Sequence, residues 1–349
     1  MAYFSGRRIL ITGGASFIGS HLTEALLEAG ALVTVADDYS SGSPENLGEA
    51  LRHVRMLELD LRSPEAAAQA CEGAEMVFHL AAAHGGRGYI ESHQAACAEN
   101  MVLDQIVYRA ALAAGAGKVV FASSACVYPG WLQDDPSAGR KRLSEDLVGP
   151  PYDPDGLYGM AKLTGELALR AIAQENGMSA AICRFFTAYG PRCGESHAIL
   201  AMIARAFVGA DPFEVWGTGE QIRSWIYVDD LVRMTLLAAE RIDDGTAVNV
   251  ATDEDHTVRE AAEIVLAAAG HNAEVVARPD MPTGPLYRSA DVALADRLLG
   301  YRPQVDLAEG VRRTTDWYRG VKDPAWVRAD LDRLLTERED AVPAGVQKV

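Results

Sequence analysis

The sequence predicts an α/β protein in which a doubly wound parallel sheet is joined to a smaller α/β lobe. Three observations lead to this prediction. Short apolar runs alternate with helical patterns through the first half of the chain, a glycine-rich turn follows the first run, and the rhythm becomes irregular after residue 180. Such alternation is typical of parallel β-α-β units with helices on both faces of the sheet.

Each expected element follows from its own pattern. Apolar runs predict strands at residues 8–12, 31–36, 54–59, 76–80, 119–122 and 180–189, and an amphipathic helix at 20–29. Shorter strands are predicted at 213–216 and 248–250, and helices near 226–241, 257–269 and 305–319. We expect a first domain over 1–185, to which a segment near 220–255 returns, a substrate lobe over 186–320, and a C-terminal helix and frayed tail over 321–349.

Composition excludes several classes of protein. The chain has 349 residues, of which 49% are hydrophobic, and a formal net charge of −17. We therefore expect a large core and no nucleic-acid partner, because nucleic-acid binding depends on Lys and Arg neutralising phosphates. The five cysteines form no Cys-x-x-Cys pair, so we predict neither a metal site nor a disulfide framework. With no signal-peptide pattern and no apolar stretch long enough for a bilayer, we expect a cytoplasmic protein without a membrane partner.

The turn after the first strand predicts a dinucleotide site on a Rossmann-type sheet. Residues 12–19 read Thr-Gly-Gly-Ala-Ser-Phe-Ile-Gly, and glycines at a strand-to-helix turn let backbone N–H groups approach a pyrophosphate. Asp37 ends the second strand, near the spacing expected for a carboxylate on the adenosine ribose, and no adjacent Arg or Lys could receive a 2′-phosphate. The sequence therefore favours NAD over NADP. Asp60 and Leu61 follow the third strand, where they could bracket adenine, although Asp60 could instead cap the next helix.

A possible catalytic set lies farther along the chain. Tyr158 and Lys162 stand four residues apart at the start of a helix, so they share one face. A nearby ammonium group lowers the pKa of a tyrosine, which would make Tyr158 a general base, with Ser124 positioning the same hydroxyl. Cys126 follows closely, and a thiol beside such a set suggests that a second proton is moved at a neighbouring carbon. The alternative for Cys126 is a small buried apolar side chain.

Taken in order, these motifs resemble the extended short-chain dehydrogenase/reductase superfamily, the NAD-dependent epimerases and dehydratases of nucleotide sugars. The resemblance covers roughly residues 6–320 and departs from the usual pattern at Ser16, where glycine is common. It implies a homodimer that pairs helices matching roughly 93–114 and 157–176. It also implies a set of NAD-binding residues: Gly13, Ser16, Phe17, Ile18, Gly19, Asp37, Asp60, Leu61, Leu80, Ala81, Ala82, Asn100, Tyr158 and Lys162.

Within the superfamily, the segments 84–90, 123–129 and 213–219 resemble GDP-mannose 3,5-epimerases. In that family the cysteine that matches Cys126 transfers a proton, and its partner is a lysine in the loop after Tyr-Gly-Pro. This chain has Ser196-His197 in that loop, which resembles GDP-fucose synthases, so His197 is the expected partner. Thr187 stands where the mannose epimerases have asparagine.

The resemblance also implies contacts with the sugar and its diphosphate. Arg223 and Arg288 match arginines that bind phosphates, and the guanidinium fork suits bidentate phosphate contact. Ion pairs with Asp230 or Asp291 are the structural alternative for these two arginines. The expected substrate-binding residues are Gly86, Arg87, Ser124, Thr187, His197, Arg223 and Arg288.

The leading hypothesis is a redox-neutral NAD enzyme that acts on a nucleotide-linked hexose, which the resemblance suggests is GDP-mannose. It would oxidise C4, invert C5, C3 or both through Cys126 and His197, and reduce C4 again. A 4-epimerase is one alternative within the same superfamily. A dehydratase is another, although this chain has Ala125-Cys126 where such enzymes have Asp-Glu. A regulator that binds NAD without turnover is the alternative from another class, and the complete Ser/Tyr/Lys set argues against it.

Overall fold

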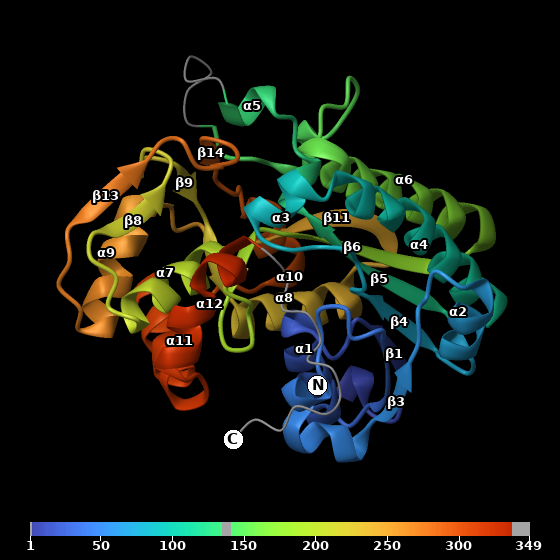
Figure 1. Cartoon of the computed structure of the whole chain (residues 1–349). Coiled ribbons are helices and arrows are strands. Elements are labelled where there is room, and N and C mark those ends of the chain that lie inside the picture. The colour runs from blue at the N-terminus through green and yellow to red at the C-terminus, as the bar shows by residue number, and fades with distance from the viewer. Residues whose placement is uncertain (1, 135–140, 337–349) are drawn as a thin grey trace.

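Seven parallel strands form the centre of the computed structural model, which describes residues 2–134 and 141–336 (Figure 1). Their order across the sheet is β11-β6-β5-β4-β1-β2-β3, and each neighbouring pair is parallel. The carboxyl ends of the strands therefore meet at one edge, and the order reverses between β1 and β4, where α/β sheets bind ligands. The strands span β1 Arg8–Thr12, β2 Leu32–Asp37, β3 Arg55–Glu58, β4 Met76–His79, β5 Lys118–Ser124, β6 Ser179–Phe185 and β11 Asp244–Val250.

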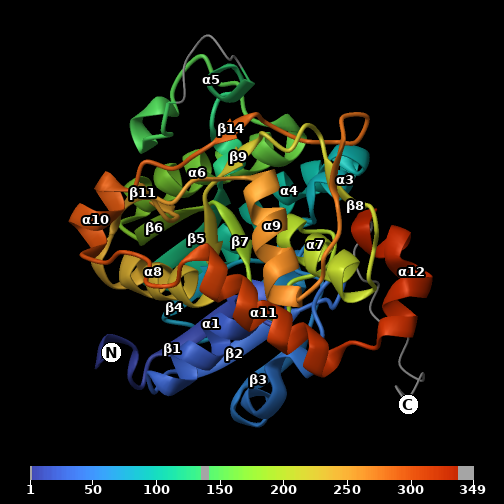
Figure 2. The same cartoon turned by 90° about the vertical axis from the view of Figure 1, so that its left-hand side faces the viewer.

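Helices cover both faces of this sheet because both faces are apolar. In β1, Ile9 and Ile11 pack on one side, while Leu10 packs on the other. Helices α1 and α8 cover the first side, with α10 beside α8, whereas α2, α4 and α6 cover the second (Figures 1 and 2). Their bounds are α1 Phe17–Glu28, α2 Pro64–Cys71, α4 Gln94–Ala113, α6 Gly156–Asn176, α8 Val228–Arg241 and α10 Ala293–Leu299.

The smaller lobe lies beside the carboxyl edge of the sheet (Figure 1). It contains a parallel pair of β8 and β13 and a three-stranded sheet in the order β12-β9-β14. Its elements are α7 Ala198–Phe207, β8 Phe213–Trp216, β9 Ile222–Arg223, β12 His256–Thr257, α9 Val258–Ala269, β13 Val275–Arg278, β14 Tyr287–Arg288, α11 Leu307–Val321 and α12 Pro324–Thr336. The described residues also include these short segments: η1 Ala2–Phe4, η2 Pro44–His53, α3 Arg87–Ser92, η3 Ala125–Val127, α5 Trp131–Asp134 and η5 Glu145–Leu147.

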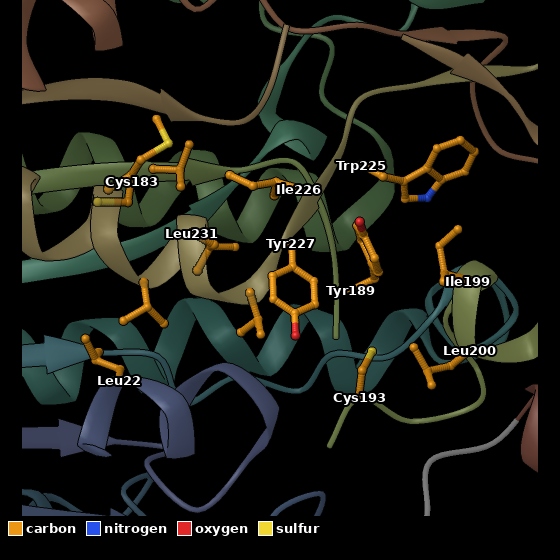
Figure 3. Close-up of a cluster of buried hydrophobic side chains, with 14 of the residues drawn as sticks. Leu22, Cys183, Tyr189, Cys193, Ile199, Leu200, Trp225, Ile226, Tyr227 and Leu231 are labelled. Atoms are coloured by element: carbon orange, nitrogen blue, oxygen red, sulfur yellow. The ribbon is translucent and has the colours of Figure 1, made fainter. Parts of the chain in front are cut away.

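An apolar cluster joins the two parts of the molecule (Figure 3). Cys183 of β6 and Leu231 of α8 belong to the first part, and Ile199 and Leu200 of α7 belong to the second. Tyr189, on β7 Thr187–Tyr189, lies between them, and Trp225, on β10 Trp225–Tyr227, lies on the side of Ile199; β7 and β10 pair in parallel with each other. Because these side chains are nearly all buried, this cluster holds the smaller lobe against the sheet.

The structure confirms the positions of the six strands predicted from the first apolar runs, and it corrects several boundaries of strands and helices. The run at 180–189 is two strands, because Phe186 separates β6 from β7 and β7 pairs with β10 outside the central sheet. The predicted helix at 226–241 begins only at Val228, since residues 225–227 form β10. Helix α1 begins at Phe17, three residues before the predicted start, directly after the glycine turn.

Two further expectations concern the ends and the surroundings of the chain. Helix α12 lies within the segment predicted as a C-terminal helix, while the predicted frayed tail, residues 337–349, lies outside the described residues. Among the helices of residues 2–134 and 141–336, none is both long and apolar enough to cross a bilayer. The predicted domain boundaries at residues 185 and 320 stay predictions.

Candidate active site

A cavity of about 1470 Å³ opens between the two lobes at the carboxyl edge of the sheet. Most of the predicted site residues line it, and they come from both lobes. These are Ser16, Phe17, Ile18, Leu80, Ala82, Gly86, Arg87, Ser124, Cys126, Tyr158, Lys162, Thr187, His197, Arg223 and Arg288. The other predicted residues are not part of this lining: Gly13, Gly19, Asp37, Asp60, Leu61, Ala81 and Asn100.

The glycine turn has the shape that a pyrophosphate site requires. Gly13 has φ +70°, and a Cβ on Gly19 would collide with the carbonyl oxygen of Gly13, so the helix starts against the turn. Ser16 fits the usual glycine position because its backbone is extended, with φ −87°, and its hydroxyl donates to the Gly13 carbonyl at 2.6 Å. The first N–H groups of α1 therefore face the cavity beside Ser16, Phe17 and Ile18, which fits a dinucleotide at this position.

Two acidic residues predicted on the cofactor have different surroundings. The Asp37 carboxylate is 6% exposed and accepts hydrogen bonds from the backbone N–H groups of Ala15 and Tyr39, both at 2.9 Å. It thus ties the end of β2 to the glycine turn. Asp60 instead forms an ion pair with Arg62 at 2.8 Å. The alternative of Asp60 as a helix cap is wrong, because the Ser63 hydroxyl caps α2 by accepting from the N–H of Ala66.

The segment after β4 is held by buried polar groups. The Thr12 hydroxyl accepts from the N–H groups of both Leu80 and Ala81 at 3.1 Å. Asn100, only 1% exposed, binds both the N–H and the carbonyl of Ala83. Leu80 and Ala82 thereby line the cavity, while Asn100 positions them from behind.

Tyr158, Lys162 and Ser124 come together, but one electrostatic prediction is wrong. Burial raises the pKa of the Tyr158 phenol well above its ordinary value, and Cys126 adds to this, whereas a hydrogen bond with Ser124 opposes it. The predicted lowering by Lys162 is not found: the phenol is affected by its burial, Cys126, Cys97, Ser124 and Asp104, and the Lys162 ammonium lies 5.9 Å from the centre of the tyrosine ring. Burial also lowers the pKa of Lys162, against the effect of Asp104.

Cys126 lies in the same cavity as the tyrosine, with its side chain 6% exposed. The Ser124 hydroxyl accepts a hydrogen bond from the Cys126 N–H at 3.1 Å, which starts the short helix η3 directly after β5. Arg288 of β14, on the other lobe, donates to the Cys126 sulfur at 3.3 Å. The thiol therefore lines the cavity beside a cation, and it also packs in a small buried cluster with Tyr89, Ile90, Cys97 and Tyr158, so its catalytic role stays a prediction.

His197 stands at the start of α7 and reaches the site through another histidine. Its ring centre lies 5.3 Å from that of His84, which in turn lies 5.1 Å from the ring of Tyr158. A Cβ on Gly86 would collide with the carbonyl of Ser196, so glycine there lets the loop after β4 approach the His197 loop. The structure thus places Cys126, Tyr158 and His197 around one cavity.

Three arginines make the cavity locally positive in an acidic chain. Arg288 and Arg87 both bind the Asp155 carboxylate at 2.8 Å. The alternative ion pairs of Arg223 or Arg288 with Asp230 or Asp291 are not formed: Arg288 pairs with Asp155, Arg223 donates to backbone carbonyls, and Asp230 accepts from Tyr301 and two backbone N–H groups. Burial, with Arg288 and Arg87 nearby, lowers the pKa of Arg223 to about 9.

Sequence reasoning missed several residues of this site. His84 was part of a quoted motif, but only its ring contacts show that it lies between Tyr158 and His197. Arg205 and Trp216 also line the cavity, with the guanidinium carbon 5.8 Å from the ring centre. Their signal was weak, since Arg205 belongs to an apolar helix. Within the described parts of the chain, no group of three or more His, Cys, Asp or Glu side chains is arranged to hold a metal ion.

The fold and this site define an NAD-binding enzyme of the Rossmann class, with a Ser/Tyr/Lys set beside the dinucleotide turn. The chain belongs to the NAD dependent epimerase/dehydratase family, which it matches over residues 9–251. It is 32% identical over 317 residues to the GDP-mannose 3,5-epimerase of Arabidopsis thaliana, covering 89% of this chain and 82% of that protein. It is also 27% identical over 328 residues to a UDP-N-acetyl-alpha-D-glucosaminuronate decarboxylase of Bacillus cytotoxicus, covering 91% and 99%.

Solved structures agree with this assignment. The UDP-glucose 4-epimerase of Thermus thermophilus, in complex with NAD, superposes with a TM-score of 0.78 at 29% identity, covering 90% of this chain and 100% of that one. The protein is therefore an NAD-dependent enzyme of the epimerase type.

Proposed function

We propose that this enzyme inverts C5, C3 or both of a GDP-linked hexose, with GDP-mannose as the substrate, by transient oxidation at C4. The observation that carries the proposal is the meeting of Cys126 and His197 in the cavity that also holds Ser124, Tyr158 and Lys162. A 4-epimerase needs only the Ser/Tyr/Lys set. The presence of Cys126 and His197 as two further candidate proton-transfer groups is explained if the reaction also takes place at C3 or C5.

In this proposal the residues of the first lobe act on the C4 hydroxyl. Ser124 orients the hydroxyl, and Tyr158 takes its proton and later returns it, with Lys162 supplying a positive charge in the same pocket. NAD, when bound along the glycine turn, supplies reversible oxidation at C4, and its own positive charge favours the phenolate. A ketone at C4 acidifies the protons at C3 and C5.

Cys126 and His197 then act at those carbons. Cys126 belongs to η3 of the first lobe, and His197 begins α7 of the second, so a sugar between them has one group on each side. One removes a proton from the ring carbon and the other delivers a proton to the opposite face, which inverts that carbon with no net change in protons. Positioned proton transfer of this kind contributes about 100- to 10,000-fold to a rate.

The remaining cavity suits a nucleoside diphosphate. Among the described residues, Arg223 donates to the carbonyls of Ile222 and Thr283 and to no carboxylate, so its charge can serve a diphosphate. Farther along, Trp216 offers a ring face and Arg205 a buried guanidinium, 8% exposed, for a base. Arginine commonly binds the O6/N7 edge of guanine, which favours GDP over UDP.

The proposal includes a cytoplasmic homodimer. Helices α4 and α6 expose Val102, Leu157, Met160 and Leu167, with Val102 58% exposed. Isolated apolar side chains are common on surfaces, but four on two helices that pack side by side support a partner face there. Light scattering of the purified enzyme tests this, and a monomer at micromolar concentration would contradict it.

Incubation with GDP-mannose in D₂O, followed by NMR, tests the function directly. Deuterium at C5, C3 or both, with a changed ring configuration, is the expected result. UDP-glucose, run in parallel, tests the second candidate, a 4-epimerase, which the Thermus structure favours. Inversion at C4 of UDP-glucose with no deuterium at C3 or C5 of either sugar would replace the first proposal by the second.

A further inference from the structure

Arg223 and Arg288 stand opposite each other on neighbouring strands of the smaller lobe. Strands β9 and β14 pair in parallel with Arg223 in register with Arg288, and both arginines line the cavity. Successive side chains along an extended chain point to opposite faces, so Ser224 and Ser289, the next residue on each strand, point away from the arginines. Neither serine is part of the cavity lining. The two arginines therefore share one face of this small sheet, and the two serines share the other.

A single carboxylate joins the two serines on the face away from the cavity. The Ser224 hydroxyl donates to Asp255 at 2.9 Å, and the Ser289 hydroxyl donates to the same carboxylate at 2.7 Å. Both serines are buried, while the Asp255 side chain is 29% exposed at the outer surface of the lobe. The Ser224 N–H also donates to the Arg288 carbonyl at 3.2 Å. The two arginine-bearing strands are therefore joined through the backbone and, behind the arginines, through Asp255.

Asp255 is itself held by other parts of the chain. It directly precedes β12, which pairs with β9 on the side opposite to β14. Arg142 donates to the Asp255 carboxylate at 3.1 Å, to the Asp253 carbonyl at 2.7 Å and to the Ala290 carbonyl at 3.3 Å. The position of this one carboxylate is thus set by three strands and by a segment from the first half of the chain.

We propose that Asp255 is a positioning residue that holds Arg223 and Arg288 at the spacing at which they bind a diphosphate together. The inference rests on the proposed function, because it takes the ligand to be a nucleoside diphosphate, and it adds the residue that prepares the site. Asp255 is not part of the cavity lining, so it acts through the two arginines.

The physical reason is the repulsion between two guanidinium groups on opposite positions of paired strands. Burial is the main cause that lowers the pKa of Arg223 to about 9, and Arg288 is the next. Before a ligand arrives, this repulsion favours separation of the two strands. The hydrogen bonds of Ser224 and Ser289 to Asp255 oppose the separation. A site held in this way does not have to spend binding energy on bringing the arginines together.

Both arginines are oriented and still have N–H groups for a ligand. The Arg288 guanidinium donates from Nε to Gln133 at 2.8 Å, from Nη2 to Asp155 at 2.8 Å and from Nη1 to the Cys126 sulfur at 3.3 Å. Within the described residues, these bonds leave one N–H on each Nη for an acceptor. Arg223 is oriented by backbone carbonyls. What remains to be fixed is the spacing of the two strands, which is the task assigned to Asp255.

Calorimetric titration of the NAD-loaded enzyme with GDP and GMP tests the proposal. In Asp255→Ala the Kd for GDP should rise about tenfold, because the arginines are no longer held at one spacing before the ligand binds. The Kd for GMP, whose single phosphate does not need both arginines, should rise by less than about twofold. Asp255→Asn should lie between Asp255→Ala and the wild type, since an amide can still bond to both hydroxyl groups. In turnover, the KM for GDP-mannose should rise while kcat stays unchanged.

A double-mutant cycle separates positioning from a general structural loss. In an Arg223→Gln background, Asp255→Ala should change the Kd for GDP by less than about twofold, because the spacing of a pair no longer matters once one member is gone. A loosened lobe would instead weaken GDP binding by the same factor in both backgrounds. Asp253→Ala is the matched control. It lies in the same turn and contacts Arg142 through a backbone carbonyl that the substitution keeps, so its Kd should equal that of the wild type.

The outcomes distinguish this inference from the proposed reaction when UDP is titrated in parallel with GDP. A raised Kd for either diphosphate in Asp255→Ala, together with no epimerisation of GDP-mannose by the wild type, would support the role of Asp255 and refute the reaction. Epimerisation together with an unchanged Kd in folded Asp255→Ala would do the reverse. Equal losses in both backgrounds of the cycle, or a wild type that binds neither diphosphate, would also overturn the inference.

Discussion

The two walls of the cavity are built in different ways. The wall at the sheet edge carries Ser124, Tyr158 and Lys162 on regular β-α structure, β5 and α6. The wall of the smaller lobe carries His197, Arg223 and Arg288 on a helix start and on two-residue strands that are held by long-range side-chain contacts. The geometry of the first wall therefore follows from the fold class, whereas the geometry of the second depends on side-chain contacts that are particular to this chain.

The two walls contribute to different steps of the proposed reaction. The first wall suits oxidation and reduction at one carbon, a reaction that many members of such a family could share. Proton transfer at the neighbouring carbons combines Cys126 from one wall with His197 from the other. Substitutions of Ser124, Tyr158 or Lys162 should abolish every step, and substitutions of Cys126 or His197 should separate the steps from one another.

Removing the phenolic hydroxyl should have the largest effect. Tyr158→Phe is expected to lower kcat by about 1,000- to 10,000-fold, because the proposed mechanism gives the C4 proton to this phenol. Turnover of GDP-mannose and the single-turnover absorbance of NADH should fall together. Thermal unfolding and NAD content serve as controls, and retained NADH formation in Tyr158→Phe would show that another group is the base.

Replacing either of the proposed proton-transfer groups should separate C4 oxidation from epimerisation. Cys126→Ser and His197→Asn should each lower epimerisation by about 100- to 10,000-fold while C4 oxidation persists. Transient NADH absorbance without an inverted product is the expected signature, because the remaining group can exchange a proton on its own face of the ring but cannot invert the carbon. Cys71→Ala, a change at another buried cysteine outside the cavity lining, is the matched control and should keep the wild-type exchange rate. Equal loss of both signals in Cys126→Ser would contradict the separation.

A buried ion pair stabilises the packing of the elements that carry the first wall. Glu166 of α6 binds Arg184 of β6 at 2.8 Å and Ser123 of β5 at 2.5 Å. Glu166→Gln should lower the free energy of unfolding by about 3–5 kcal/mol, because it leaves the Arg184 charge buried without a counter-ion. Urea denaturation measures this loss, with Arg52→Gln, which breaks an exposed ion pair, as a control that should change stability by less than about 1 kcal/mol.

The ion pair between Glu166 and Arg184 also determines how the stability of the fold changes in acid. Burial acts to raise the pKa of Glu166, but Arg184 and Ser123 outweigh it and hold that pKa below its ordinary value. Its stabilisation is therefore complete above the unfolded-state pKa of about 4.3 and is lost as the pH falls toward the folded-state value. The difference in stability between wild type and Glu166→Gln should shrink in acid, and a difference that grows there would refute the assignment.

The smallest predicted effect concerns nucleotide affinity in alkali. Because the pKa of Arg223 is lowered to about 9, the arginine loses its charge above that pH unless a diphosphate holds the proton. The Kd for GDP should rise about tenfold per pH unit above that value in the wild type and remain flat in Arg223→Gln, as calorimetry can show. Parallel curves for the two proteins would place the diphosphate elsewhere.

Much of the first wall could be predicted from sequence because its signals are local. The glycine turn, the spacing of Tyr158 and Lys162, and the position of Ser124 after an apolar run each lie within one element or one connection. The split between β6 and β7 could not be predicted, because Phe186 continues the apolar pattern while its strand neighbours pair with different partners. The raised pKa of Tyr158 was also missed, since that pKa is raised mainly by burial among residues that are distant in sequence.

Short stretches of sequence were enough to predict the parallel sheet and the dinucleotide turn, because periodicity and turn chemistry are local, and the family resemblance added the candidate groups for proton exchange. What those groups contact depends on the packing of distant segments. The packing places Arg288 against the Cys126 sulfur, His84 between Tyr158 and His197, and the Arg223 guanidinium on backbone carbonyls rather than on the carboxylates of the alternative reading. Most of these contacts join segments far apart in the chain, and their distances depend on how two lobes pack together.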